Sequence, residues 1–235
     1  MTKKLDHKIA LITGASRGIG AAVALELAKN GAHVIALARS VGGLEELDDQ
    51  IKAMGGNATL LPLDLSKGDK IDSIGPTIAE RFGRLDIFIG NAGMLGPLSP
   101  CGHIKPKDWD KVMAVNFHAN IRLIRTLDPL LHKSEAGRVL FTTTDLADQC
   151  PAYWGPYSTS KAALNAFMHT YAAETQEGNL RVNAIHPGSV QTKMMEEAFP
   201  GGTPFKTKQP HEVASDFIDL VDESCVQHGQ IIKLP

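Results

Sequence analysis

Tyr157 and Lys161 are the two side chains whose types and spacing most clearly suggest chemistry. They stand four residues apart in the segment YSTSK, so on a helix the phenol and the ammonium would share one face. A free tyrosine has a pKa of about 10, and a drop of roughly 3 units, or about 4 kcal/mol, would make it useful near neutral pH. A unit charge about 4 Å away at an effective dielectric of about 20 supplies energy of that order, before desolvation is subtracted. The pair is therefore a candidate proton donor.

The same spacing is common on exposed helices, so the pair needs support from elsewhere in the chain. A glycine-rich segment, TGASRGIG at 13–20, follows an apolar run and precedes a helical pattern. Gly14 can adopt backbone angles closed to other residues, Gly18 lets a phosphate approach closely, and Gly20 permits tight packing of helix on strand. A purely structural turn is the alternative, but the position after the first strand favours a nucleotide whose pyrophosphate meets the helix amides. The turn residues expected to bind it are Gly14, Ser16, Arg17, Gly18, Ile19 and Gly20.

The end of the second strand indicates which dinucleotide would bind. An NAD site usually places an acidic residue about 20 residues after the glycines, to bind the ribose 2′-hydroxyl. Here the segment HVIALAR at 33–39 ends instead at Arg39, and Arg17 lies in the glycine turn. Two guanidinium groups could hold a 2′-phosphate, so the sequence favours NADP(H); the alternative is that both are ordinary surface charges.

Two further strand ends carry candidate cofactor contacts. Asp64 is placed to accept a hydrogen bond from the adenine amine, with the Leu65 backbone beside it, although Asp64 could equally cap a turn. In IGNAG, Asn91, Ala92 and Gly93 offer small or backbone-bonding groups next to a nucleotide, or make a plain turn.

Short apolar runs alternate with longer helical patterns along almost the whole chain, which predicts a parallel sheet with helices on both faces. The predicted strands are 8–13, 33–38, 58–63, 85–89, 138–143, 180–185 and 229–234. The predicted helices are 18–30, 42–54, 69–82, 106–132, 156–177 and 210–222. Two segments that contain Pro and Gly, 94–106 and 191–210, interrupt this alternation of strands and helices. Both follow strand ends, where ligands of open α/β sheets bind.

Length and composition narrow the class of protein. At 235 residues we expect one large α/β domain spanning 1–235, and a formal charge of −2 gives no reason to expect nucleic acid or an anionic membrane as a partner. The three cysteines are scattered without CxxC spacing, so we expect reduced thiols and no metal site. No run approaches about 20 apolar residues and no signal segment is recognisable, so we expect a cytoplasmic protein without a membrane span.

Taken together, the motifs resemble a known family, the classical short-chain dehydrogenases/reductases. The resemblance runs in order from about residue 8 to about residue 232, over TGASRGIG at 13–20, DL at 64–65, NAG at 91–93, Asn116, YSTSK at 157–161 and HPG at 186–188. Among bacterial members the chain is similar to NADP-type oxidoreductases with AFP in the substrate loop. The resemblance implies a doubly wound Rossmann fold with seven parallel strands in the order 3-2-1-4-5-6-7. It also implies that 191–210 is a substrate-loop insertion.

The family's roles transfer to this chain where the positions match. Tyr157 would be the general acid in carbonyl reduction and the general base in the reverse direction. Lys161 would lower the tyrosine pKa and bind the nicotinamide ribose, and Asn116 would hold a water linking the lysine to solvent. Both Tyr157 and Lys161 therefore count as catalytic and as cofactor-binding. After the sixth strand, the residues expected around the nicotinamide are Pro187, Gly188, Val190 and Thr192.

One catalytic position departs from the family. The family usually has serine thirteen residues before the tyrosine, and this chain has Thr144. Threonine keeps the hydroxyl that can bind the substrate oxygen, but its methyl narrows the pocket and stiffens χ1. Thr143 is a weaker substitute, and His186 is expected to be a packed side chain rather than a catalyst.

The expected substrate is a small-molecule carbonyl or alcohol compound, of apolar character. The pocket is expected to be lined by Met94, Leu95, Leu146, Cys150, Tyr153, Trp154, Met194 and Met195. We expect a homodimer through the helices 106–132 and 156–177, and a tetramer stays open. Two other functions are considered: a regulator or scaffold that binds NADP without turnover, and a sugar-nucleotide epimerase, which usually has TGxxGxxG and a longer C-terminal part.

Overall fold

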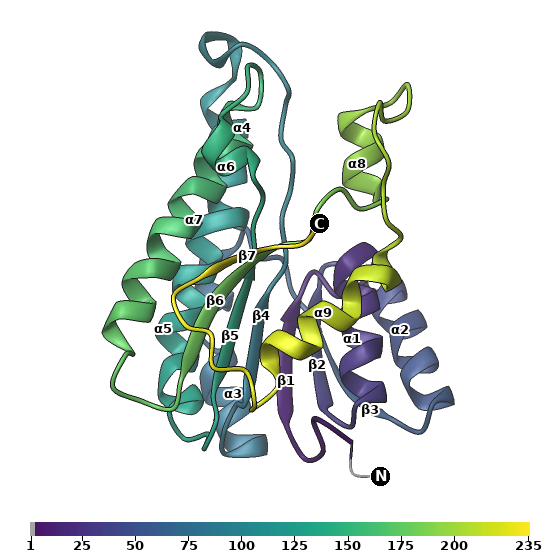
Figure 1. Ribbon diagram of the computed structural model, residues 1–235, viewed down its shortest axis with the longest axis vertical. Coiled ribbons are helices and arrows are strands. Elements are labelled where there is room, and N and C mark those ends of the chain that lie inside the picture. The colour runs from purple at the N-terminus through teal and green to yellow at the C-terminus, as the bar shows by residue number, and fades with distance from the viewer. Residues whose placement is uncertain (1–2) are drawn as a thin grey trace.

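The computed structural model describes residues 3–235, which form one seven-stranded parallel sheet flanked by helices (Figure 1). The strand order is β3-β2-β1-β4-β5-β6-β7, which confirms the expected order. The strands are β1 (Ile9–Thr13), β2 (His33–Ala38), β3 (Asn57–Pro62), β4 (Ile87–Gly90), β5 (Arg138–Thr142), β6 (Arg181–His186) and β7 (Ile231–Lys233). The order reverses between β1 and β4, and the crevice of a doubly wound sheet opens at such a point.

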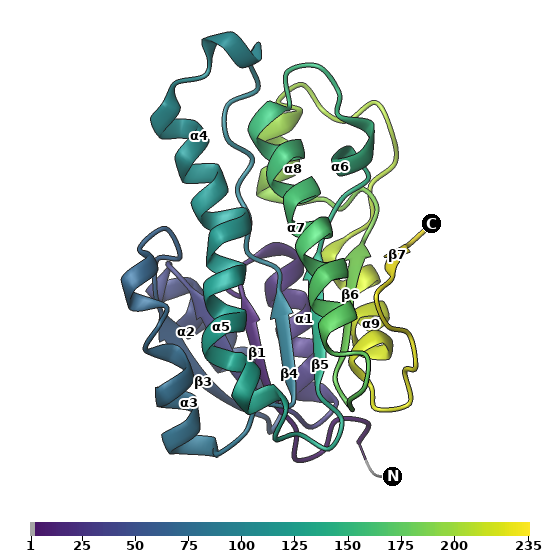
Figure 2. The ribbon, with the colours of Figure 1, turned by 90° about the vertical axis from the view of Figure 1, so that its left-hand side faces the viewer.

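Helices cover both faces of the sheet (Figures 1 and 2). On one face lie α1 (Gly18–Lys29), α2 (Val41–Ala53) and α9 (Pro210–Val221). On the other lie α3 (Ile74–Phe82), α5 (Ala119–Leu131) and α7 (Gly155–Glu174). Because both faces are covered, the central strands are apolar without alternation, as in β1, where Ala10 and Ile12 join one core layer and Leu11 joins the other.

The predicted helix 106–132 is interrupted, which corrects that expectation. It consists of α4 (Pro106–Met113), a π-helical stretch η3 (Ala114–His118) and α5, which follow one another as a single column in Figure 2. The Asn120 amide donates a hydrogen bond of 2.9 Å to the backbone oxygen of Asn116 within this stretch. Such π-helical turns are rare and often occur at functional sites.

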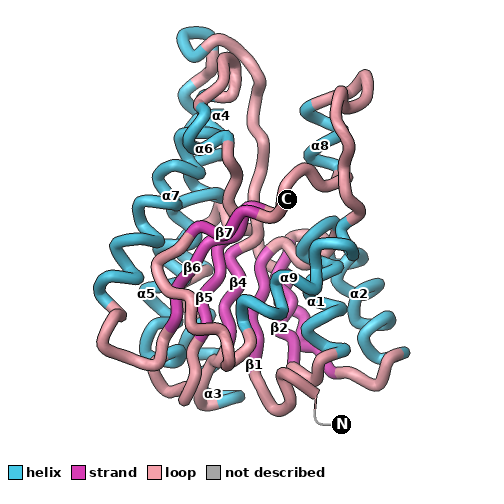
Figure 3. The backbone as a smooth tube through the Cα atoms, viewed as in Figure 1, coloured by secondary structure: helices cyan, strands magenta, loops and turns pink. Residues whose placement is uncertain are grey.

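The irregular segments contain short helices at the carboxyl ends of the strands (Figure 3). They are η2 (Cys101–His103), α6 (Leu146–Gln149) and α8 (Lys193–Ala198), while η1 (Gly68–Lys70) precedes α3. A parallel bridge between Val190 and Lys208 joins the two ends of the 191–210 segment. The segment therefore projects from the sheet as a closed loop that carries α8.

Candidate active site

A cleft of about 1130 Å³ opens at the carboxyl ends of the strands. In Figure 1, α8 rises on one side of this region, and α4, α6 and the start of α7 rise on the other. Every residue that the sequence predicts to act in catalysis or to bind the cofactor lines the cleft, with the exception of Asn116. The fold thus brings residues from position 14 to position 192 into one site.

The glycine turn forms the floor of the cleft between β1 and α1. Gly14 and Gly18 have φ angles of 70° and 59°, which glycine adopts without strain. A Cβ atom on Gly20 would lie 2.2 Å from the backbone oxygen of Gly14, so only glycine fits there. A Cβ on Gly18 would lie 3.3 Å from the Thr192 Cγ2, which shows that the loop before α8 closely approaches the turn.

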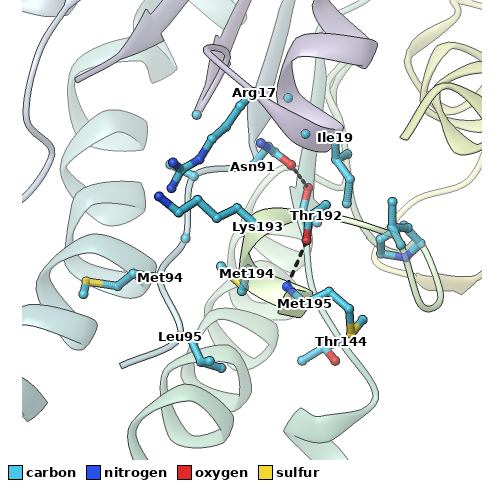
Figure 4. Close-up of a pocket in the computed structure, with 18 of the residues that line it drawn as sticks. Arg17, Ile19, Asn91, Met94, Leu95, Thr144, Thr192, Lys193, Met194 and Met195 are labelled. Atoms are coloured by element: carbon cyan, nitrogen blue, oxygen red, sulfur yellow. Dashed lines mark hydrogen bonds between the residues drawn. The ribbon is translucent and has the colours of Figure 1, made fainter. Parts of the chain in front are cut away.

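The cationic groups at this end of the cleft are exposed. Arg17 precedes α1 in an extended conformation, and Arg39 follows β2 directly. Within residues 3–235 neither guanidinium takes part in a hydrogen bond or ion pair with another side chain, so both are available to an anion. In Figure 4 the side chains of Arg17 and Lys193 extend to the same side of the cleft.

Asp64 and Asn91 both have structural partners. The Asp64 Oδ1 accepts a hydrogen bond of 3.0 Å from the Ser66 backbone, so the turn-capping role is present. Burial alone would raise the pKa of Asp64, but the bonds from Ser66 and the charge of Arg39 lower it. The Asn91 amide donates to the Thr13 backbone oxygen at 3.1 Å and accepts from the Thr142 hydroxyl at 3.3 Å. Asn91 therefore ties β1, β4 and β5 together beneath the cleft.

Tyr157 and Lys161 lie in the first turns of α7, on the side that faces the cleft. The Lys161 side chain is buried, and its ammonium donates a hydrogen bond of 2.7 Å to the backbone oxygen of Thr142 at the end of β5. Burial lowers the pKa of Lys161 to about 8. Lys161, beside the end of β5, therefore loses its proton at a lower pH than an exposed lysine does.

The pKa of Tyr157 differs from the sequence-based expectation. Burial, followed by the charge of Asp145, raises the pKa of Tyr157 to about 12. Although part of the side chain reaches the cleft, enough protein surrounds the phenol to disfavour its ionised form. The expected lowering by Lys161 is absent from this arrangement, in which the ammonium is bonded to a backbone carbonyl. At neutral pH the phenol is protonated.

Asn116 lies behind the pair rather than in the cleft. Its amide oxygen accepts from the Met94 backbone at 2.8 Å, and its amide nitrogen donates to the Met94 oxygen at 3.0 Å and to the Ser160 hydroxyl at 2.9 Å. The Ser160 hydroxyl donates in turn to the Tyr157 backbone oxygen at 2.8 Å. Asn116 therefore joins the loop after β4 to α7, and a water link from Asn116 to Lys161 stays a prediction.

Three successive threonines stand at the carboxyl end of β5, of which only Thr142 belongs to the strand, and their hydroxyls have different partners. Thr142 bonds to Asn91, and the Thr143 hydroxyl donates to the buried Asn165 Oδ1 at 2.6 Å. Thr144 donates to the Asp145 Oδ1 at 3.3 Å and accepts from the Leu146 backbone at 3.3 Å. These two bonds are long, so the Thr144 hydroxyl is held less tightly than that of Thr143.

The loop after β6 and the helix α8 close the far side of the cleft. Gly188 has a φ angle of 75°, and the Thr192 hydroxyl caps α8 by accepting from the Met195 backbone at 3.2 Å. In Figure 4, Thr144, Met94, Leu95, Met194 and Met195 surround the end of the cleft away from Arg17. This end is therefore mostly apolar.

Of the eight residues expected to line the substrate pocket, two do not line the cleft: Cys150 and Tyr153. Both have positive φ angles, 46° and 75°, and Tyr153 is 58% exposed. The unusual backbone between α6 and α7 turns these side chains outwards. Trp154 does line the cleft, and an aromatic row continues from it to Phe199 and Phe205, with ring centroids 6.2 Å and 5.3 Å apart.

Comparisons with known proteins agree with this geometry. Residues 8–201 match the family described as short chain dehydrogenase. The chain belongs to the short-chain dehydrogenase family. It is 36% identical to the oxidoreductase YciK of Escherichia coli K12, over 93% of this chain and 88% of that protein. It is 34% identical to versicolorin reductase stcU of Emericella nidulans, over 90% and 81% of the two chains.

Solved structures of short-chain dehydrogenases share the whole architecture. A short-chain dehydrogenase from Escherichia coli CFT073, complexed with NADPH, superposes with a TM-score of 0.93 at 36% identity, covering 99% of this chain and 98% of that chain. A second, from Shigella flexneri and complexed with NADP, gives 0.93 at 35% identity, with 99% of each chain covered. The sheet order and the flanking helices are therefore those of the family.

Among the polar residues that line the cleft of this short-chain dehydrogenase without having been expected there are Asp145, directly before α6, and Gln149 in α6. His186 at the end of β6, which was expected to be a packed side chain, lines the cleft as well. The His186 Nε2 lies 3.6 Å from the Asp145 Oδ1, and its Nδ1 is buried without a hydrogen-bond partner among the described residues. The sequence TTTD, with an acid directly after the third threonine, was the available signal for Asp145.

Among residues 3–235, no group of three or more His, Cys, Asp or Glu side chains is placed to hold a metal ion. None of the described helices has the length and apolar character needed to cross a membrane.

Proposed function

We propose that the protein is an NADP(H)-dependent oxidoreductase that transfers hydride between the nicotinamide and a carbonyl or alcohol substrate, with Tyr157 as general acid and base. The observation that carries the proposal is the position of Tyr157 and Lys161 in the same cleft as the glycine turn. The short-chain dehydrogenases complexed with NADP and NADPH support the choice of cofactor.

The chain's own residues fit such a dinucleotide. Gly20 leaves room for the tight turn that directs the first amides of α1 into the cleft, and a pyrophosphate suits that position. Arg39 replaces the acidic residue that would bind a ribose 2′-hydroxyl, and Arg17 adds a second unpaired guanidinium within the described chain. When bound, the cofactor supplies or accepts the hydride.

In the reducing direction, Tyr157 gives its phenolic proton to the substrate oxygen as hydride reaches the carbonyl carbon, so that C=O becomes CH–OH. The high pKa of Tyr157 means that the proton is present at neutral pH. Lys161, whose ammonium is held at the end of β5 in the same cleft, would bind the nicotinamide ribose and so orient the cofactor beside Tyr157. Thr144 supplies a hydroxyl beside the same substrate oxygen.

The walls of the cleft support an apolar substrate. Met94, Leu95, Met194 and Met195 surround its reactive end, and methionine adapts to irregular shapes. Trp154 and Phe199 add an aromatic wall that suits a planar ring. We therefore propose medium-sized apolar aldehydes, ketones or quinones as the substrate class.

The test is NADPH oxidation over a panel of aldehydes, ketones and quinones. Tyr157→Phe is expected to lower kcat/KM by about 10²–10⁴-fold, because it removes a general acid. Tyr153→Phe is the matched control, since that exposed side chain lies outside the cleft, and it should retain wild-type activity. Equal turnover by wild type and Tyr157→Phe would show that the assigned acid is wrong. Tight NADPH binding without turnover over the whole panel would favour the non-catalytic alternative.

A further inference from the structure

The Thr144 hydroxyl has a single hydrogen, and in this structure it is directed at a carboxylate. Thr144 Oγ1 donates to Asp145 Oδ1 at 3.3 Å, while its lone pairs face the Leu146 backbone amide, also at 3.3 Å. A hydroxyl carries one donor, so a hydrogen bonded to Asp145 is unavailable to a substrate oxygen. Asp145 therefore competes with the substrate for the one group that replaces the family's serine.

The carboxylate is held in place by neighbouring elements. Gln149 in α6 donates to the Asp145 Oδ2 at 2.8 Å. His186 at the end of β6 places its Nε2 3.6 Å from Oδ1, which is a charge contact when the imidazole is protonated and too long for a hydrogen bond. Asp145 and Gln149 line the cleft together with Tyr157. Asp145 is thus a fixed negative charge in the reactive part of the cleft.

We propose that Asp145 is a positioning residue that controls the hydroxyl hydrogen of Thr144 and, through its charge, disfavours the phenolate of Tyr157, so that the site is biased towards carbonyl reduction. The inference rests on the hydride-transfer function proposed above. Reduction requires Tyr157 as an acid, whereas alcohol oxidation requires it as a base. A negative neighbour favours the first state over the second.

At the alkaline pH at which Tyr157 loses its proton, the other charged groups near Asp145 do not cancel the effect of its charge on the Tyr157 pKa. Burial lowers the pKa of His186, and Lys233 in β7 lowers it further, whereas Asp145 raises it. Because the net shift is downwards, the imidazole is neutral at alkaline pH. The Lys233 ammonium is 3.3 Å from the Asp148 carboxylate and is paired there. Lys161, with a pKa of about 8, has lost most of its charge above that pH. Asp145 is accordingly the second cause, after burial, of the raised pKa of Tyr157.

The experiment measures the ionisation of Tyr157 directly, without substrate or cofactor. The chain has three tyrosines, so the phenolate absorbance of Tyr157→Phe can be subtracted to isolate one of them. Asp145→Asn keeps an oxygen acceptor and the side-chain shape but removes the charge. At a fixed alkaline pH at which circular dichroism shows a folded protein, its Tyr157 phenolate fraction should be about tenfold larger. A tenfold change corresponds to a shift of about one pKa unit, which is of the order expected for a single charge in the same cleft at an effective dielectric of about 20.

Asp110→Asn is the matched control, because Asp110 in α4 is exposed, lies outside the cleft and makes no side-chain hydrogen bond or ion pair within residues 3–235. It should leave the Tyr157 phenolate fraction unchanged. Asp145→Ser serves as a second variant, should Asp145→Asn fail to fold. Equal phenolate fractions in wild type and a folded Asp145 variant would overturn the proposal.

Turnover then separates this inference from the function on which it rests. In Asp145→Asn the rise of the alcohol oxidation rate with pH should occur about one pH unit lower. The ratio of kcat for oxidation to kcat for reduction at neutral pH should increase. A changed phenolate fraction with an unchanged ratio would overturn the directional bias. A wild-type protein without any Tyr157-dependent turnover would refute the proposed function instead, and the titration would still report on Asp145.

Discussion

The two ends of the cleft are built by different physical means. The nucleotide end depends on backbone shape: Gly14 and Gly18 supply positive φ angles, and the atoms packed around Gly20 leave no space for a side chain there. The reactive end depends on buried polar side chains from distant elements, such as Lys161 on the Thr142 carbonyl and Asn116 on Met94. Adding atoms should damage the first end, whereas removing hydrogen-bonding groups should damage the second.

The difference also concerns stability. Glycines in the turn relieve strain, so at the nucleotide end the residues that serve binding also serve folding. At the reactive end a lysine with 3% exposure is held at a lowered pKa, which disfavours its charged form in the folded protein. The role proposed for Lys161 and the stability of the folded protein therefore oppose one another, and this contrast leads to three predictions.

The largest expected effect is that of Lys161→Met. Activity should fall by about 10²-fold or more, because the ammonium proposed to bind the nicotinamide ribose is lost. Stability should behave oppositely. Because the pKa of Lys161 in the folded protein, about 8, is below the usual lysine pKa of 10.5, the folded wild type binds fewer protons than the unfolded chain between these pH values, and its stability should rise with pH there. The rise amounts to about 3 kcal/mol at most, and Lys161→Met should lack it.

Urea unfolding at about pH 7 and about pH 9.5 checks this prediction. Lys29→Met is the control, because Lys29 is a surface side chain with 65% exposure and should preserve the wild-type dependence on pH. The same pH dependence in Lys161→Met and wild type would contradict the contrast between the two ends.

Next in size is Gly20→Val, which adds atoms at the nucleotide end. The new Cβ would overlap the Gly14 oxygen and approach the Asn91 amide at 2.6 Å, so the turn must shift. We expect a loss of about 3 kcal/mol in the free energy of unfolding, together with loss of NADPH binding. Thermal unfolding and fluorescence titration with NADPH measure both. Gly42→Ala in α2, where no heavy atom lies within 4 Å of the added Cβ, should leave both unchanged.

The smallest expected effect is that of Arg39→Asp on cofactor choice. Loss of a charge-assisted contact is worth about 1.5–3 kcal/mol, so the preference for NADPH over NADH should fall by roughly 10–100-fold, with stability unchanged. Ratios of kcat/KM for the two cofactors give the answer. Arg81→Asp, on α3 and away from the cleft, should retain the wild-type ratio. Unchanged selectivity in Arg39→Asp would refute the phosphate contact.

Much of the fold was predictable because its signals are local. The strand, glycine turn and helix at the N-terminal end follow one another along the chain, and each glycine's role is expressed within a few residues. The strand order came from the family resemblance. The interruption of helix 106–132 was not predicted, because it involves Asn116, whose side chain contacts Met94 and Ser160, residues 22 and 44 positions away.

The sequence by itself determined the family, the alternation of strands and helices, and the residues offered for catalysis. Only the tertiary structure decided the state of those residues: Tyr157 with a raised pKa, Thr144 bonded to Asp145, and Cys150 and Tyr153 turned away from the cleft. The physical reason is that pKa values and hydrogen-bond partners depend on burial and on groups from other strands. Residue type and spacing specify which groups exist, and packing specifies which of them meet.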